Sequence, residues 1–152
     1  MSDRVPTFAT VYTCPVGSEV AAAQVILDAD LTELGPEIGP DGEGLVQGRL
    51  YYDPNVEISR VEEIAHGLMA LGCTFSVGHD AREDYQGQLW RGVPALGLHR
   101  AAYHDGTVLV ADRSITSALE SATSLAELGG LLHDLMGTKW EEAIAPLRVE
   151  GA

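Results

Sequence analysis

The sequence predicts an α+β domain in which a mainly antiparallel sheet is followed by C-terminal helices packed on one face. Alternating β-branched and aromatic residues indicate several strands before residue 113. The dipeptide Asp105-Gly106 between two such stretches is typical of a two-residue hairpin turn. Beyond residue 113, apolar residues recur at helical spacing between capping signals. The predicted order is β-α-β-α-β-β-β-β-α-α-α, in which the last four strands form a meander.

Two strand–helix pairs are predicted in the first part of the chain. They are strands over residues 8–13 and 45–52 and helices over residues 18–34 and 59–71. Ser18 can cap the first helix, although the pattern of this segment also fits a strand. The turn Asp53-Pro54-Asn55 closes the second strand. Ser59 and Glu62 have the spacing of a capping box, which predicts the start of the second helix.

The meander is predicted from four short alternating segments with short connections. These segments are residues 73–80, 85–91, 96–104 and 107–112. The two-residue turn sets the register of the last hairpin, because directly opposed residues then follow from counting outward. Counting pairs Tyr103 with Val108 and, further along, His99 with Asp112.

The C-terminal part of the chain is predicted to be helical over residues 114–122, 125–136 and 139–145. The pairs Ser124/Glu127 and Thr138/Glu141 have capping-box spacing, and Gly137 is placed as a stop. The dipeptide Gly129-Gly130 lies inside the second of these helices. Because each glycine costs about 1 kcal/mol relative to alanine in a helix, the pair indicates close packing or a bend.

Length and composition favour one domain over residues 1–152 with an ordinary hydrophobic core. No apolar stretch is long enough to cross a bilayer, and no signal-peptide pattern is present, so we expect a cytoplasmic protein. A net charge of −14 disfavours nucleic acid and anionic membranes and favours a basic protein partner. Cys14 and Cys73 match no metal or redox spacing and are interpreted as reduced, buried residues.

Acidic residues are concentrated near the N-terminus. Residues 17–63 contain eleven Asp and Glu but only two basic residues, and residues 35–44 form a predicted exposed loop rich in glycine and proline. The predicted acidic surface consists of Asp28, Asp30, Glu33, Glu37, Asp41 and Glu43. Its spacing does not fit a calcium-binding loop, and no phosphate-binding glycine motif occurs, so neither a metal nor a cofactor is predicted.

Two groups of residues are candidates for function within the meander. His99 and Asp112 are weak catalytic candidates, because a carboxylate beside an imidazole prepares a general base; a structural pairing is the simpler interpretation. Trp90, Arg91, Arg100 and Tyr103 are candidates for binding, with Trp90 as an anchor if it is exposed. Burial of Trp90 beneath the C-terminal helices is the alternative. The arginines could also pair with the chain's own acids.

The leading hypothesis is a small, acidic, non-enzymatic protein-interaction domain, for example an inhibitor or accessory factor that acts on a basic partner surface. One alternative is a small enzyme with a pocket centred on His99 and Asp112, with His79 or Cys73 nearby. Another is a structural subunit of a homo-oligomer or larger assembly. The interaction domain requires a contact surface, the enzyme requires polar groups that converge in a pocket, and the structural subunit requires self-association.

Overall fold

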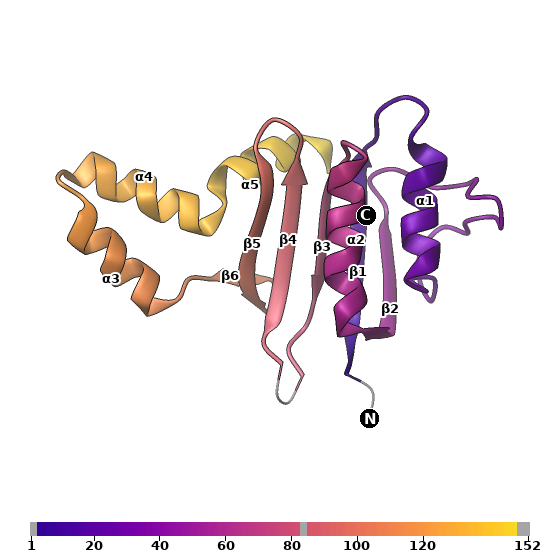
Figure 1. Cartoon of the computed structure of the whole chain (residues 1–152), viewed down its shortest axis with the longest axis horizontal. Helices are drawn as coiled ribbons and strands as arrows, with labels where there is room; N and C mark the ends of the chain where they lie inside the picture. The colour runs from indigo at the N-terminus through magenta and orange to yellow at the C-terminus, as the bar shows by residue number, and fades with distance from the viewer. Residues whose placement is uncertain (1–2, 83–84, 149–152) are drawn as a thin grey trace.

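The computed structural model describes residues 3–82 and 85–148 and contains a six-stranded sheet of order β2-β1-β3-β4-β5-β6 (Figure 1). Every neighbouring pair of strands is antiparallel. The strands are β1 (Arg4–Thr13), β2 (Leu50–Glu57), β3 (Thr74–His79), β4 (Gly87–Val93), β5 (Gly97–His104) and β6 (Thr107–Leu109). The helices are α1 (Glu19–Asp28), α2 (Ile58–Ala70), α3 (Asp112–Ser121), α4 (Leu125–Met136), α5 (Thr138–Ile144) and the 3-10 turn η1 (Ala145–Leu147). The predicted α+β class, element order and four-strand meander are confirmed.

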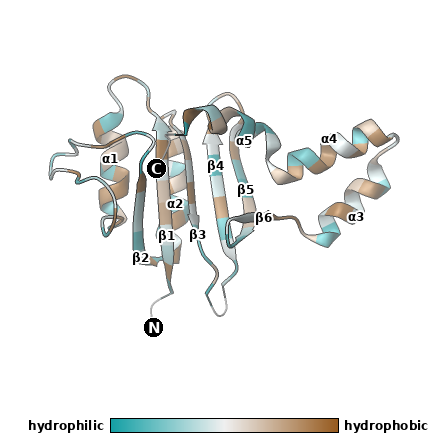
Figure 2. Cartoon of the chain, turned by 180° about the vertical axis from the view of Figure 1, so that it is seen from behind, coloured by the Kyte–Doolittle hydropathy of each residue, from teal (hydrophilic) through white to brown (hydrophobic). Residues whose placement is uncertain are grey.

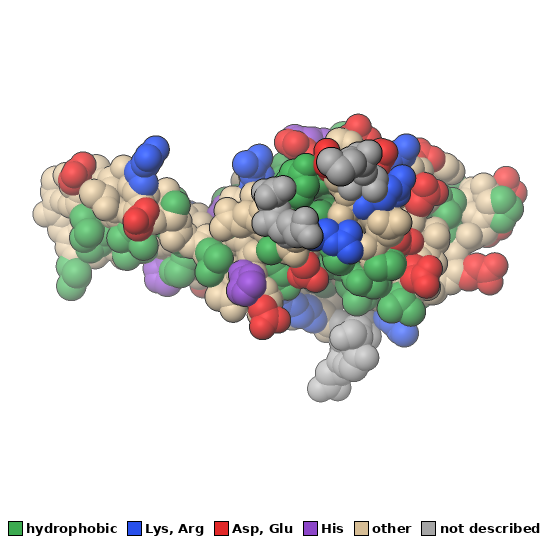
Figure 3. Space-filling model, turned by 90° about the horizontal axis from the view of Figure 1, so that it is seen from below, with side chains coloured by type: hydrophobic (Ala, Val, Ile, Leu, Met, Phe, Trp, Pro, Cys, Tyr) green, Lys and Arg blue, Asp and Glu red, His purple; other side chains and the backbone are tan. Residues whose placement is uncertain are grey.

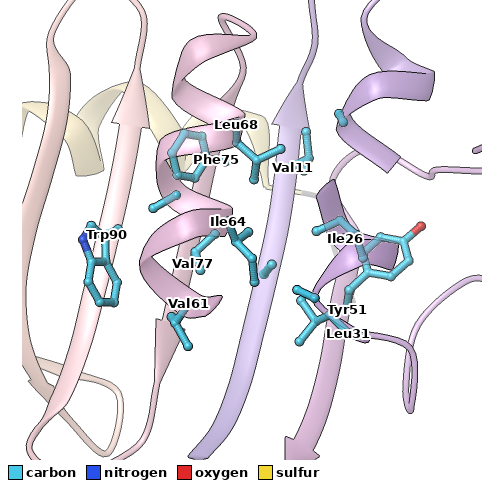
Figure 4. Packing of buried hydrophobic residues seen from close by; sticks show 14 of the residues in the cluster. Val11, Ile26, Leu31, Tyr51, Val61, Ile64, Leu68, Phe75, Val77 and Trp90 are labelled. Atoms are coloured by element: carbon cyan, nitrogen blue, oxygen red, sulfur yellow. The ribbon is translucent and has the colours of Figure 1, made fainter. Parts of the chain in front are cut away.

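The main hydrophobic core lies between the sheet and the two helices α1 and α2 (Figure 4). On β3, Phe75 and Val77 are fully buried, and Trp90 of β4 lies directly opposite Val77 in the ladder. Gly92 is opposite Phe75, and a Cβ there would lie 2.2 Å from the Phe75 ring, so only glycine leaves room for that ring. Full burial of each such side chain stabilises the fold by about 1.5–3 kcal/mol.

The opposite face of the sheet is covered only in part, by α5 and η1. Ile144 of α5 is fully buried, and it lines a cleft on this face together with Phe8 and Tyr103, whose rings lie 5.6 Å apart. The expectation that the C-terminal helices pack on one face therefore holds for α5. In contrast, α3 and α4 extend beyond the β6 edge of the sheet (Figure 1).

The strand β2 differs from its predicted bounds, because it begins at Leu50 and runs through the segment expected to be a turn, Asp53-Pro54-Asn55. The ladder to β1 shifts register between Val5 and Thr7, opposite this segment. Since β2 is an edge strand and the shift is a bulge, Pro54 can lie in it without removing a ladder hydrogen bond. Residues 45–49 belong to the preceding loop instead.

Two helix starts also differ from the predicted caps. The helix α1 follows Ser18 as expected, but Ser18 makes no side-chain cap, and the helix ends at Asp28 rather than near residue 34. The helix α2 begins at Ile58, before the predicted box of Ser59 and Glu62, and makes no side-chain cap. The N–H of Ile58 donates to the Asp3 carbonyl at 2.7 Å, so a long-range backbone contact satisfies one of the first N–H groups of the helix, which have no partner within it.

Candidate functional site

The helices α3 and α4 form a hairpin, residues 112–136, which we call the arm. The arm leaves the body of the molecule at the β6 edge and points away from it (Figure 1). Six apolar side chains of α4 are exposed or only half-buried: Leu125, Leu128, Leu131, Leu132, Leu135 and Met136. Leu125 is 84% exposed, and Leu119 on the neighbouring α3 is 58% exposed. Within α3 only Ala118 is buried, so the two helices of the arm shield each other incompletely.

The apolar residues of α4 lie on one face of the helix. Leu125, Leu128, Leu132 and Leu135 are separated by three, four and three positions, which is the repeat of a helix-packing seam. Figure 2 shows these hydrophobic segments on both helices of the arm, with nothing from the body of the chain lying over them. Ser124 caps α4 as predicted, since its side chain accepts from the Glu127 N–H at 3.1 Å.

The end of α4 is fixed to the sheet by two side chains, and the following helix α5 is fixed to it by a third. The Nη2 group of Arg91 donates to the Met136 carbonyl at 2.7 Å, and the Nε2 group of His99 donates to the Leu135 carbonyl at 3.1 Å. The indole of Trp140 donates to the Gly97 carbonyl at 3.0 Å. The last carbonyls of α4, which have no partner within the helix, are thereby satisfied. The root of the arm is therefore held against the sheet, although the rest of the arm projects away from the body of the molecule (Figure 1).

Gly137 is required at this root. Its φ of 73° is left-handed, and a Cβ there would lie 2.3 Å from Arg91 Nη2 and 2.6 Å from His99 Nδ1. The predicted stop at Gly137 is thus confirmed. The second predicted box, Thr138/Glu141, does not form, because Gly137 is the N-cap of α5 and Thr138 is already helical. The side chain of Glu141 pairs instead with Arg148, at 2.9 Å between Oε2 and Nη2.

Burial shapes the titration of the polar groups at the root. Desolvation lowers the pKa of His99, and the neighbouring Arg91 lowers it further. Burial also lowers the pKa of Arg91, while Glu141 opposes that shift. Arg148 is the main cause of the lowered pKa of Glu141. The side chain of Arg91 is 5% exposed, and its Nε has no hydrogen-bond partner, so its role is to hold the backbone of α4 rather than to meet a partner at the surface.

The six predicted acidic-surface residues are all exposed, and we call them the acidic end. They are Asp28, Asp30, Glu33, Glu37, Asp41 and Glu43. They belong to the last turn of α1 and to the loop that connects α1 to β2, at the end of the molecule opposite the arm (Figure 1). In Figure 3 acidic side chains gather toward this end, whereas hydrophobic side chains line the arm. The loop is pinned to the sheet edge where Leu34 pairs with Tyr52.

The predicted binding residues of the meander do not form an exposed site. Trp90 is 5% exposed and belongs to the core, with the guanidinium of Arg100 6.0 Å from its ring centroid. The exposed-anchor interpretation of Trp90 is therefore wrong, because the strand register directs this side chain into the core on the α2 side of the sheet. The alternative of burial beneath the C-terminal helices is also wrong, since α5 lies on the other face. Tyr103 is half-buried and lines the cleft on the opposite face, which has a volume of about 380 Å³ and also contains Arg91.

The expected pairing of His99 with Asp112 does not form in the sheet. The hairpin register is as predicted for Tyr103 with Val108, but the ladder ends at Leu109, and Asp112 is the first residue of α3. The chain leaves the sheet before the predicted pair, and His99 is engaged with the end of α4. His79 is also buried, on the core face, and its Nδ1 lies 3.0 Å from the Asp80 carbonyl.

The two cysteines are brought together by the fold, which their spacing in the chain did not indicate. Cys73 is fully buried, Cys14 is half-buried, and their Sγ atoms are 3.5 Å apart. Burial is the main cause of the raised pKa of both thiols, which for Cys73 reaches about 12. Both are free thiols, as expected.

Within residues 3–82 and 85–148, no three His, Cys, Asp or Glu side chains are arranged to hold a metal ion. Among the helices of this described part, none is long and apolar enough to cross a membrane.

Comparison with known proteins yields one match. A protein-family model with the description "Protein of unknown function (DUF3145)" matches residues 48–152. No curated protein and no solved structure matches this chain. The matched region begins just before β2 and includes the meander and the arm, but it leaves out the acidic end.

Proposed function

The chain belongs to this DUF3145 family, and we propose that it is a non-enzymatic protein-interaction domain whose arm is the contact surface. The observation that carries the proposal is α4, a helix with six large apolar side chains of which none is buried. Large, contiguous apolar surface is rare on proteins that work alone and marks contact sites. Covering one such leucine contributes about 1.5–3 kcal/mol, so even part of this face could support a specific complex.

The position of the arm also supports this role. Two hydrogen bonds from the sheet to the end of α4 order its root, so docking a partner would not first require the helices to be positioned. The family model spans the arm, which makes the arm part of the region that the chain shares with its family. The acidic end lies outside that region, so we assign it the secondary role of steering encounters toward basic protein partners.

The enzyme alternative has less support. It required His99 and Asp112 to converge in a pocket, whereas His99 donates to the Leu135 carbonyl and Asp112 starts α3. An imidazole engaged in this way holds a helix end and is not free to accept a proton from a substrate.

The proposal is tested by quantitative affinity capture from native lysate with three versions of the chain. These are the wild type, the arm variant Leu119→Ser/Leu125→Ser and the acidic-end variant Asp41→Asn/Glu43→Gln. All four substituted residues are exposed, so the fold is expected to persist, and circular dichroism verifies this. We expect partner chains to be lost with the arm variant and retained, with lower yield at low salt and a weaker dependence on salt, with the acidic-end variant. Identical capture by the wild type and the arm variant would contradict the proposal.

A further inference from the structure

We propose that the occupant of the arm is a second copy of this chain, with the two α4 helices crossing antiparallel about a two-fold axis near Gly129. The inference rests on the proposed function, because it takes the arm to be a contact surface. It adds the identity of the partner and the point of closest approach.

The glycine pair in α4 has no function within a single chain. A Cβ added at Gly129 or at Gly130 would meet no atom within 4 Å, so neither glycine is needed for packing in the described structure. The backbone does not need them either, since neither has a positive φ and both lie within a regular helix. Glycine is the poorest helix former after proline, and its usual compensation in a helix is the close approach of another backbone.

The two glycines lie on different faces of α4. Gly129 is four residues after Leu125 and three before Leu132, which puts it on the apolar face. Gly130 is three residues after Glu127 and four before Asp134, which puts it on the polar face. Only Gly129 is therefore placed to allow a partner helix to approach closely.

The location of Gly129 along α4 fits a symmetric contact. Gly129 lies four residues after the first residue of α4 and seven before the last, so a crossing there falls away from both ends of the helix. In a two-fold contact the same surface meets itself, and the helices come closest at the axis. Leu125 and Leu132 lie four residues before and three residues after Gly129, so an antiparallel crossing there brings Leu125 of one copy toward Leu132 of the other. Leu125 is 84% exposed and Leu132 is half-buried in the single chain. The helix macrodipoles are then also opposed.

Two copies can meet through their arms in spite of the negative net charge, because the acidic end lies at the opposite end of the molecule. A net charge of −14 makes copies repel one another, so self-association requires the charges to remain apart. Contact through the arms places the two acidic ends at the far ends of the pair (Figure 1). Their separation then exceeds the Debye length of about 8 Å at physiological salt, which screens the repulsion. Ile115 and Leu119 of each α3 would flank the crossing and complete a four-helix bundle.

The test is the mass of the full chain by sedimentation velocity at increasing concentration, up to about 1 mM, so that even a weak dimer is populated. Two matched variants are compared, Gly129→Gln and Gly130→Gln. Both make the same chemical change in the same helix, and both side chains have open space in the single chain. We expect the wild type and Gly130→Gln to form dimers of similar affinity, whereas Gly129→Gln raises the dissociation constant at least about tenfold, since a side chain at the crossing separates the helices.

A wild type that stays monomeric at the highest concentration overturns the inference, as do equal affinities for the two glycine variants. The capture experiment separates this failure from that of the proposed function. If the wild type is monomeric but the arm variant loses a different captured protein, the arm is a contact surface and the second copy is not its occupant. If the wild type is monomeric and the arm variant captures what the wild type captures, both proposals fail.

Discussion

Removing the side chains of Ile144 and of Leu125 should have very different effects, although both belong to the C-terminal helices. Ile144 is fully buried between α5 and the sheet, whereas Leu125 on the arm is 84% exposed. The change Ile144→Ala deletes roughly three buried carbons at about 0.8 kcal/mol each, and the cavity that remains adds to this loss. We therefore expect the free energy of unfolding to fall by about 2–5 kcal/mol for Ile144→Ala and to change by at most about 0.5 kcal/mol for Leu125→Ala.

Urea denaturation at low protein concentration measures both values. Tryptophan fluorescence suits the purpose, because Trp90 reports on the core and Trp140 reports on the root of the arm. If the slope of the free energy of unfolding against urea concentration is the same for the wild type and both variants, the three proteins expose the same surface on unfolding. The reasoning is refuted if Leu125→Ala costs more than about 1.5 kcal/mol, since the arm of the single chain would then be packed against the body. A cost below about 1 kcal/mol for Ile144→Ala would equally refute the assignment of Ile144 as the anchor of α5.

Three further predictions concern the body of the molecule. Burial lowers the pKa values of His79 and His99, so the folded state takes up protons less readily than the unfolded chain. We expect the free energy of unfolding to be full above about pH 6.5, to fall as the pH is lowered from there toward the folded-state pKa values, and to level off below them; a flat profile in urea titrations between pH 7.5 and 5 would contradict this. Gly92→Ala places a Cβ against the Phe75 ring and should lower the free energy of unfolding by about 1–3 kcal/mol, whereas Gly106→Ala, where a Cβ meets no neighbour but φ is positive, serves as a comparison for backbone strain alone. The pKa of about 12 for Cys73 predicts that iodoacetamide at neutral pH modifies this thiol far more slowly in the folded protein than in urea, and equal rates by mass spectrometry would show that the site is open.

Local signals in the sequence were sufficient where the physical cause is local. The turn Asp105-Gly106 forms as predicted, with Asp105 and Gly106 at φ values of 47° and 81°, because this turn type depends only on its two central residues. Gly137 ends α4 and Ser124 caps it, for similarly local reasons. The capping box at Ser59 failed because α2 begins one residue earlier, at Ile58, whose N–H donates to the distant Asp3 carbonyl, so Ser59 lies inside the helix.

The candidate site was predicted only in part. The composition identified the acidic end, since charged side chains in a glycine- and proline-rich loop are exposed in almost any fold. The arm was missed, because its leucines have the same pattern as a helix that packs on a sheet. The open glycine pair was the available signal. By itself the pair indicates close packing or a bend, and no packing partner for it exists among the described residues.

The sequence by itself determined the order of the helices and strands, the meander, the hairpin turn and the strongly acidic character of the chain. These follow from residue periodicity, turn chemistry and composition, which act over a few neighbouring positions. Only the tertiary structure decided that Trp90 is buried, that His99 holds the end of α4 rather than pairing with Asp112, and that α3 and α4 project from the sheet. Each of these depends on which distant segments meet. A hydrophobic pattern indicates that one face of a helix or strand is buried, but it does not specify which segment buries it.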